Sequence, residues 1–312
     1  MNNKSFLALS LSALMLLGIT VASSRNAYAH TFSGDESASF LATVEVIKVH
    51  LELAKSDLAT NATLSAEHVE HAAEHLTNDT IKEITEKNKR LGTELPASLD
   101  ELQETLEGGD ATAADVNEKV TNINDLLDET VTVRIEKTQV SNSTVQGTML
   151  ADLVDEVLES YKGAYGIEEE EHEDEEGSRN ATEETSDEGD SMIGVDGEHN
   201  TIVNMMDYES AQALAARAQE LFNTKLKAMA ESNATEAVRA LDAGLKKLKQ
   251  AIDDKAPHDN VDVIVHTDIH PNIQKAYNLR VIPEFPLPIL VGILGIASVL
   301  AYTRMKGTKR LQ

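Results

Sequence analysis

The amino-acid sequence predicts an all-α protein of helical hairpins or bundles in two halves, joined by an acidic disordered linker and followed by one C-terminal transmembrane helix. Three observations predict this class. Apolar residues recur at spacings of three and four through most of the chain, which is the period of an amphipathic helix. An acidic stretch interrupts that period once, and an uninterrupted apolar run of helix length lies near the C-terminus. No segment shows the strict alternation of a half-buried strand.

The helix boundaries follow from caps and breakers. Thr80-x-x-Glu83 and Ser98-x-x-Glu101 have the form of capping boxes and predict two helix starts, while Gly92 and Gly108 predict the ends of those helices. Pro257 ends one helix, and Pro271 breaks or kinks the last. We expect helices over 35–59, 65–76, 80–92, 98–108, 112–137, 149–163, 207–230 and 235–255, with a final helix starting at 259.

The acidic stretch divides the chain. Residues 168–198 contain fifteen acidic side chains and one basic side chain, with few apolar residues to bury. Such a composition is typical of a solvated linker, which keeps a surface soluble more readily than it captures cations. We therefore expect an N-terminal helical domain over 30–166, a linker over 167–203 and a C-terminal helical domain over 204–280.

Both ends of the chain predict export. Lys4, the apolar run over 6–21 and the small-x-small site Ala27-Tyr28-Ala29 are typical of a signal peptide over 1–29. At the other end, an apolar run over 287–302 is long enough to cross a membrane once, and the basic residues after it favour a cytoplasmic C-terminus. The intervening residues are then expected to be anchored at the outer face of the cell membrane.

The C-terminal segment 283–312 resembles a known sorting tag. Pro283, Glu284, Phe285 and Pro286 precede the apolar run, and basic residues close it. This order is similar to the archaeal PEF-CTERM signal. The resemblance implies that an archaeosortase is a partner, and that it removes the helix and transfers the protein to a membrane lipid. A plain tail anchor is the alternative, and both leave the protein on the membrane.

Composition excludes several classes of function. The net charge of −27 would repel the phosphates of a nucleic acid, so no nucleic-acid partner is expected. Cysteine is absent, which removes disulfides, thiolate metal sites and cysteine nucleophiles. Asn-x-Ser/Thr sequons mark candidate glycosylation sites on an exported chain. They are Asn61, Asn78, Asn142, Asn180 and Asn233.

A histidine-rich helix carries the main candidate site. His68, His71 and His75 fall within about 60° of one another around a helix, beside its apolar stripe. His50 lies on the preceding helix, which the short loop predicts to be antiparallel, so it is a further candidate ligand. Neutral imidazole suits copper, zinc, nickel and iron, and neighbouring glutamates add charge or orient the rings. A solvated His/Glu surface is the alternative.

Three weaker patterns also involve histidine. His71-Ala72-Ala73-Glu74-His75 fits the His-x-x-Glu-His pattern of inverted zinc peptidases, but no third ligand follows, and we expect no enzyme. Asp262, His266 and His270 recur every four residues and form a second candidate metal group, with helix capping and an Asp–His pair as the favoured reading. His30 would be the first residue after signal cleavage, where it could bind copper, although chance placement is the favoured explanation.

A second resemblance concerns the C-terminal helices. Residues 207–222, beginning Asp207-Tyr208-Glu209-Ser210-Ala211, and the segment Ala251-Ile252-Asp253-Asp254-Lys255-Ala256-Pro257 look similar to the helical extracytoplasmic domain of high-affinity iron permeases. The chain lacks the multi-span permease and its Arg-Glu-x-x-Glu pathway. The resemblance therefore implies an accessory that binds or delivers metal, with a metal permease as its partner.

These observations predict a surface-anchored helical protein that binds copper, iron or zinc and assists metal uptake or storage. The alternative is a structural or interaction glycoprotein of the archaeal cell envelope without a metal function.

Overall fold

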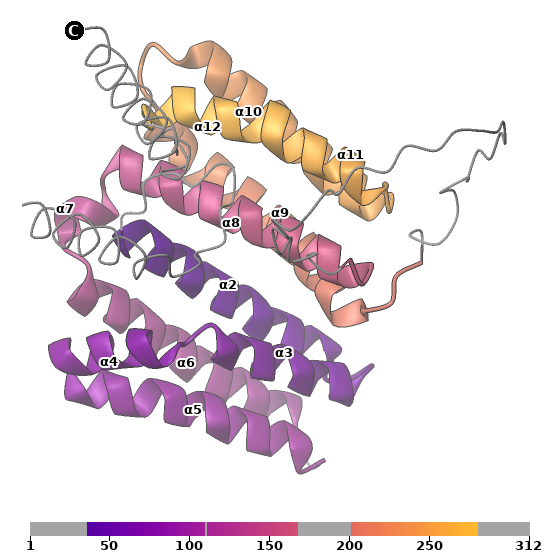
Figure 1. Ribbon diagram of the computed structural model, residues 1–312. Helices are drawn as coiled ribbons and strands as arrows, with labels where there is room; N and C mark the ends of the chain where they lie inside the picture. The colour runs from indigo at the N-terminus through magenta and orange to yellow at the C-terminus, as the bar shows by residue number, and fades with distance from the viewer. Residues whose placement is uncertain (1–35, 110, 168–200, 280–312) are drawn as a thin grey trace, which may run out of the picture. The chain divides into compact units, whose positions relative to one another are not determined.

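The computed structural model describes residues 36–109, 111–167 and 201–279, and every regular element in these ranges is a helix (Figure 1). The all-α class is thus confirmed for this part of the chain. The elements are α2 Glu36–Asp57, α3 Ala62–Glu74, α4 Asn78–Lys87, α5 Lys89–Glu107, α6 Ala113–Arg134, α7 Lys137–Val140, α8 Ser143–Ala164, α9 Met205–Thr224, the 3-10 turn η1 Leu226–Ala228, α10 Thr235–Asp253, α11 His258–Val263, the π-helical segment η2 Ile264–Ile269 and α12 His270–Tyr277.

Polar side chains set the starts of several helices. The side-chain oxygen of Asn61 accepts a hydrogen bond from the backbone N–H of Leu64 at the start of α3. Thr112 does the same for α6 and Asn142 for α8. Each cap satisfies a backbone donor that has no partner within its own helix, which is why these helices begin where they do.

The chain turns between α4 and α5 at Asn88, so the predicted boundaries of these two helices are wrong. The side chain of Asn88 accepts from two backbone N–H groups of the following turn and caps α5. Ser98, predicted as a helix start, lies inside α5. Thr77, one turn before the predicted cap Thr80, caps α4. Local capping by Asn and Thr therefore outweighed the two Ser/Thr-x-x-Glu patterns.

Gly92 packs α5 against α4 and does not end a helix. A Cβ atom at Gly92 would lie 2.8 Å from the Cα atom of Thr85 and still closer to its hydroxyl oxygen. Only glycine allows so close an approach of the two backbones. The predicted end at Gly108, by contrast, is the C-cap of α5.

The helices on both sides of the acidic stretch belong to one compact unit, Gly34–Arg280. α9 packs against α8, α2 and α3, while α10 and α12 pack on one another and on their neighbours α9 and α8 (Figure 1). Two buried tyrosines join these layers, because Tyr161 donates to the carbonyl of Ala256 at 2.6 Å and Tyr208 donates to that of Ile252 at 3.1 Å. The helices in the two ranges predicted as helical domains, 30–166 and 204–280, thus share a core, a point on which the sequence alone gave no prediction.

The described residues that flank the acidic stretch meet at the C-terminus of α8. The backbone N–H groups of Val203 and Asn204 both donate to the carbonyl of Ala164, at 2.8 and 3.2 Å. α8 and α9 are consequently joined as a helical hairpin, although 33 residues, 168–200, separate their described flanks. Residues 168–200 themselves lie outside the described ranges.

The last helix is continuous through Pro271 because its hydrogen-bonding pattern changes to that of a π-helix before the proline. η2 is a π-helical segment that precedes α12, and Pro271 occupies the first turn of α12. Proline is tolerated there because its missing N–H is not needed. Asn278, with a positive φ of 52°, ends α12 in the left-handed conformation.

Several predictions fall on residues outside the described ranges: the signal peptide, the sorting motif Pro283–Pro286 with its apolar run, and Asn180. None of the helices in the described ranges combines the length and apolar character that a membrane crossing needs. The sequon residues Asn61, Asn78, Asn142 and Asn233 are all exposed. Two of them, Asn61 and Asn142, also cap the N-termini of α3 and α8.

Candidate metal centre

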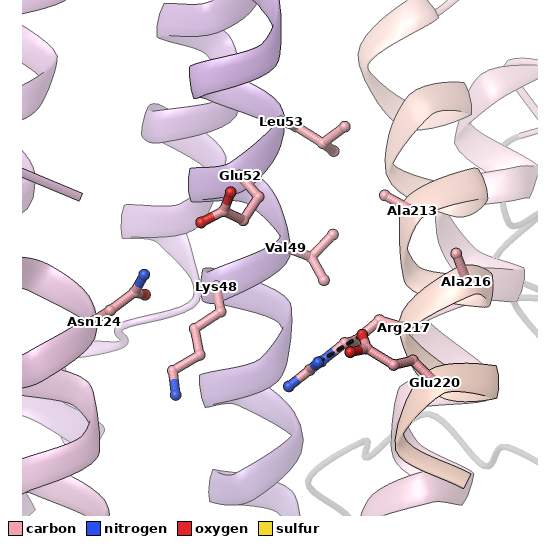
Figure 2. Close-up of a pocket in the computed structure, with 9 residues that line it drawn as sticks. All are labelled: Lys48, Val49, Glu52, Leu53, Asn124, Ala213, Ala216, Arg217 and Glu220. Carbon is pink, nitrogen blue, oxygen red and sulfur yellow. Dashed lines mark hydrogen bonds and ion pairs between the residues drawn. The ribbon is translucent and has the colours of Figure 1, made fainter. Parts of the chain in front are cut away.

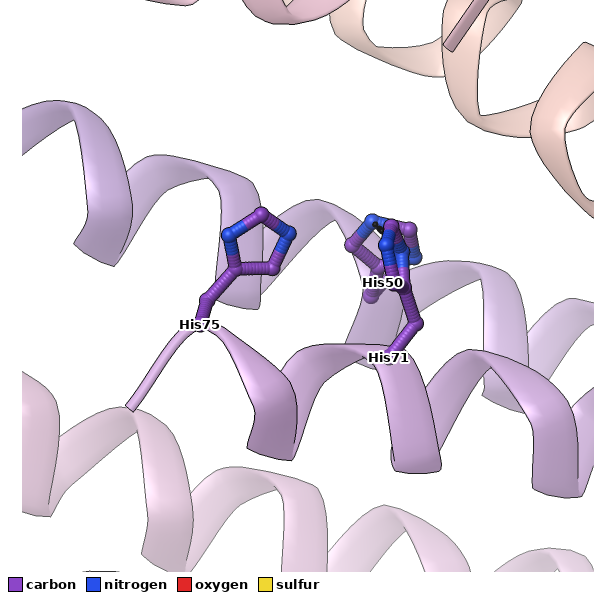
Figure 3. Close-up of side chains that lie close together, drawn as sticks. All are labelled: His50, His71 and His75. Carbon is purple, nitrogen blue, oxygen red and sulfur yellow. Dashed lines mark hydrogen bonds between the residues drawn. The ribbon is translucent and has the colours of Figure 1, made fainter. Parts of the chain in front are cut away.

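Three histidines from two helices converge at the interface of α2 and α3 (Figure 3). His50 comes from α2, while His71 lies in α3 and His75 is its C-cap residue. Each offers one ring nitrogen, and these nitrogens lie within 4.8 Å of one another. We call His50, His71 and His75 the three-histidine site.

The α2–α3 hairpin explains why these rings meet. The N–H groups of Thr60 and Asn61 donate to the carbonyl of Asp57, which closes the turn, and Ser65 donates its hydroxyl to the carbonyl of Ala54 at 2.7 Å. The two helices therefore run antiparallel in a fixed register. His50, on the buried face of α2, then lies opposite the histidine face of α3.

The rings of the three-histidine site are in direct contact. Nδ1 of His71 lies 3.1 Å from Nε2 of His50, a distance at which one nitrogen donates a proton to the other. The ring centroids of His71 and His75 are 4.9 Å apart, and those of His50 and His75 are 5.9 Å apart. Three rings at this spacing can turn their nitrogens to a common point.

Burial keeps the imidazoles of His50 and His75 neutral. It lowers the pKa of His50 to about 2, helped by His71, His68 and His75. Burial, followed by His71, lowers the pKa of His75 to about 4. A neutral imidazole has a free lone pair and binds metal without first losing a proton, so at neutral pH His50 and His75 are ready ligands.

His68 belongs to a different group. Its Nε2 lies 3.4 Å from Oδ2 of Asp57 and 3.6 Å from Oε2 of Glu209, and the three atoms form a second set within 4.8 Å of one another. We call Asp57, His68 and Glu209 the mixed site. The sequence predicted that His68 would share an ion with His71 and His75, whereas the structure places it among carboxylates from α2 and α9.

The two sites touch through His50 and His68. Their Nδ1 atoms lie 3.3 Å apart, and both side chains are fully buried. Burial lowers the pKa of His68 to about 4, against the opposing effect of the Asp57 carboxylate. Burial and then the Asp57 carboxylate raise the pKa of Glu209 to about 7.

Carboxylates from α8 and α9 surround the outer edge of the three-histidine site. Oε1 of Glu156 lies 3.8 Å from Nε2 of His75, and burial, with the charges of Glu159 and Asp155, raises the pKa of Glu156 to about 7. Burial also raises the pKa of Asp207, while nearby His71 lowers it. These groups place negative charge beside the rings, where it would stabilise a bound cation.

The glutamates within the histidine-rich run face outward. Glu67, Glu70 and Glu74 are exposed on α3, so the carboxylates near the histidines come from other helices. In the inverted zinc peptidase pattern the glutamate between the two histidines activates water. Here Glu74 points to solvent, away from the buried face that carries His71.

The second predicted group does not converge in the same way. Asp262, His266 and His270 are not among the sets of three ligand atoms within 4.8 Å in the described residues. Nδ1 of His266 lies 3.0 Å from the backbone carbonyl of Asp262, and Nε2 of His270 lies 3.0 Å from Oδ1 of Asp155 on α8. His258 lies near Asp259. Nδ1 of His266 also lies 3.5 Å from Oδ1 of Asp262, which is an Asp–His pair of the kind favoured from the sequence.

Sequence reasoning missed Asp57, Glu209 and Glu156. Asp57 follows His50 by seven residues, two helical turns along the same face, so its spacing was a usable signal. No spacing in the sequence indicates that Glu209 or Glu156 lies near the histidines, because this depends on how α9 and α8 pack against the α2–α3 hairpin.

A separate hollow of about 490 Å³ lies between α2, α6 and α9 (Figure 2). Val49 and Leu53 of α2 face Ala213 and Ala216 of α9 across it, and Arg217 lies at one end. None of the histidines lines this hollow. It therefore contributes nothing to either group of metal-ligating side chains.

Comparison with known proteins finds no matching family model, no similar curated protein and no similar solved structure. The geometry of the three-histidine and mixed sites is therefore the basis on which a function is inferred.

Proposed function

We propose that this chain is a transition-metal-binding protein of the outer cell surface, which holds copper, zinc or iron at the three-histidine site. The observation that carries the proposal is the convergence of three ring nitrogens, from His50, His71 and His75, within 4.8 Å. Three imidazoles form a ligand set that copper and zinc favour and that iron accepts.

The surroundings of the site support binding of a cation over a structural role for these histidines. Histidine rings packed against one another gain little in a core, and burial disfavours the charged forms of His50 and His75. Nε2 of His75 is buried without a hydrogen-bond partner. Such atoms are rare in folded proteins, and an ion coordinated at this nitrogen would satisfy it.

The cellular role rests on the two ends of the sequence. A signal peptide and a PEF-CTERM-like tail would place the helical unit outside the membrane, either anchored or attached to lipid by an archaeosortase. There it would collect metal for storage or deliver it to a permease. The net charge of −27 would raise the local concentration of cations around it.

Calorimetric titration of the purified full-length protein with Cu²⁺, Zn²⁺ and Fe²⁺ tests the proposal. We expect saturable binding in the wild type and its loss at this site in the double variant His71→Ala/His75→Ala. Both positions are partly exposed, so the variant keeps most of the core.

The matched control is His258→Ala/His266→Ala, which removes two partly exposed histidines from α11 and η2. It should bind like the wild type. Wild-type affinity in the His71/His75 variant would overturn the proposal and favour an envelope glycoprotein whose histidines have no metal function.

A further inference from the structure

The mixed site contains three buried polar atoms that have no hydrogen-bond partner. They are Oδ2 of Asp57, Nε2 of His68 and Oε2 of Glu209. The side chain of His68 has no exposed surface. A buried polar atom without a hydrogen bond destabilises the folded state, and here three such atoms lie within 4.8 Å of one another.

The charges of the mixed site favour the binding of a cation. Two carboxylates approach each other and the same imidazole nitrogen, at 3.4 Å for Asp57 and 3.6 Å for Glu209. Two like charges this close repel strongly in a partly buried site. A single divalent ion between them would accept all three lone pairs and remove the repulsion.

We propose that Asp57, His68 and Glu209 form a second divalent-cation site, distinct from the three-histidine site and adjacent to it. The donor set of one nitrogen and two carboxylates suits Zn²⁺, Mn²⁺ or Fe²⁺ better than Cu⁺, which prefers sulfur and imidazole. The inference does not depend on whether the three-histidine site holds an ion, because the two groups share no ligand.

The mixed site lies near the surface of the helical unit on its carboxylate side. The side chains of Asp57 and Glu209 are 14% and 29% exposed, while that of His68 is fully buried, although the oxygen atoms that face His68 are buried. The two carboxylates are therefore the part of the mixed site nearest to solvent.

An ion in the mixed site would also join three helices. Asp57 ends α2, His68 lies in α3 and Glu209 lies in α9. These helices come from opposite sides of the acidic stretch. Binding to the folded state alone would therefore raise the unfolding temperature, and the rise would grow with the logarithm of the ion concentration.

The test uses full-length protein in the His71→Ala/His75→Ala background, where the three-histidine site is removed. Zn²⁺ and Mn²⁺ are added separately, bound metal is counted by native mass spectrometry, and the unfolding temperature is measured. We expect one bound ion and a higher unfolding temperature. Adding Asp57→Asn/Glu209→Gln, which keeps the side-chain shapes, should abolish both effects.

The matched control is Glu52→Gln/Glu220→Gln in the same background. It removes two carboxylates from the same two helices, but both lie outside the mixed site and form local pairs with Lys55 and Arg217. It should still bind one ion. Absence of a bound ion in the background protein, or retention of the ion after Asp57→Asn/Glu209→Gln, would overturn the inference.

A second comparison tests the mixed site even if the variant His71→Ala/His75→Ala does not fold. In the otherwise wild-type chain, Asp57→Asn/Glu209→Gln should bind one ion fewer than Glu52→Gln/Glu220→Gln, and equal numbers would overturn the mixed site. Failure of the proposed function has a different signature: metal binding would survive His71→Ala/His75→Ala and disappear entirely with Asp57→Asn/Glu209→Gln.

Discussion

Nδ1 of His50 faces Nδ1 of His68 at 3.3 Å, in the buried layer between α2 and α3. Only one proton fits between two nitrogens at this distance. Nε2 of His50 faces the three-histidine site, while Nε2 of His68 faces the mixed site. A ring that binds metal through Nε2 keeps its proton on Nδ1, so both rings cannot act as ligands in this way without losing their contact.

This contact predicts antagonism between the two ions. We expect the mixed site to bind Zn²⁺ roughly tenfold more tightly in His71→Ala/His75→Ala than in wild-type protein that already carries one ion, a typical size for coupling between sites. Stepwise calorimetric titration measures both affinities. Equal affinities would show that the rings move apart freely when both sites are filled.

Acid should destabilise the metal-free protein through the buried histidines. The unfolded chain takes up a proton on His75 near its ordinary pKa of 6.5, but the folded chain does so only near 4. The unfolded state therefore binds more protons in this window, and stability falls as the pH drops from 6.5 to 4.

Substituting His75→Gln removes one of these histidines. We expect the variant to lose less free energy of unfolding than the wild type over that window, by roughly 2–3 kcal/mol. Urea unfolding at pH 6.5 and pH 4.5, after treatment with a chelator, measures the difference. The same pH dependence in both proteins would contradict the burial argument for His75.

Asp152 should make the stability of the protein depend on pH in the opposite sense, so that stability falls as the pH rises. Burial, and then the charge of Asp155, raises the pKa of Asp152 from 3.8 to about 7, while His270 lowers it. The folded state therefore holds this proton more tightly, and the carboxylate destabilises the protein increasingly as the pH rises from 4 to 7.

Asp152→Asn should raise the free energy of unfolding by roughly 2–4 kcal/mol at pH 8 and by little near pH 4. Asp259→Asn is a suitable control, because Asp259 is fully exposed and should change stability little at either pH. Urea unfolding at the two pH values compares them. A gain of equal size at pH 4 and pH 8 would mean that packing, and not charge, is responsible.

Gly147 should tolerate no larger residue. A Cβ atom there would lie 2.5 Å from Cβ of Tyr277, whose ring is fully buried where α8 meets α12. We expect Gly147→Ala to lower the free energy of unfolding by about 1–3 kcal/mol through overpacking.

Gly108→Ala provides the comparison for that variant in the same measurement. Gly108 lies at the exposed end of α5, and the nearest atom to an added Cβ would be the carbonyl oxygen of Glu104, at 3.3 Å. Its effect should be clearly smaller. Similar losses for the two variants would show that α8 and α12 can separate at little cost.

Much of the fold could be predicted because it depends on local pattern. The three- and four-residue spacing located most helices, and a short loop at Asn61 predicted an antiparallel hairpin, which made His50 a candidate neighbour of the histidine-rich helix. The break between α4 and α5 was misplaced, because Gly92 serves a close helix contact that no local pattern reveals.

The candidate site was predictable only where its residues share a hairpin. His50, His71 and His75 follow from helical spacing and an antiparallel turn. His68, by contrast, lies apart from these three and close to Glu209. This arrangement depends on how α9 packs on the α2–α3 hairpin, and more than a hundred residues separate these helices in the sequence. Helical periodicity contains no information on that register.

The carbonyl oxygen of Ala164 accepts hydrogen bonds from the backbone N–H groups of both Val203 and Asn204, so the described residues on either side of 168–200 lie next to each other. The contacts that hold α8 and α9 together consequently do not depend on how many residues separate them. A shortened insert, a foreign peptide or a cleavage site placed there should leave the helical unit assembled, which makes this position a convenient one for attaching a label.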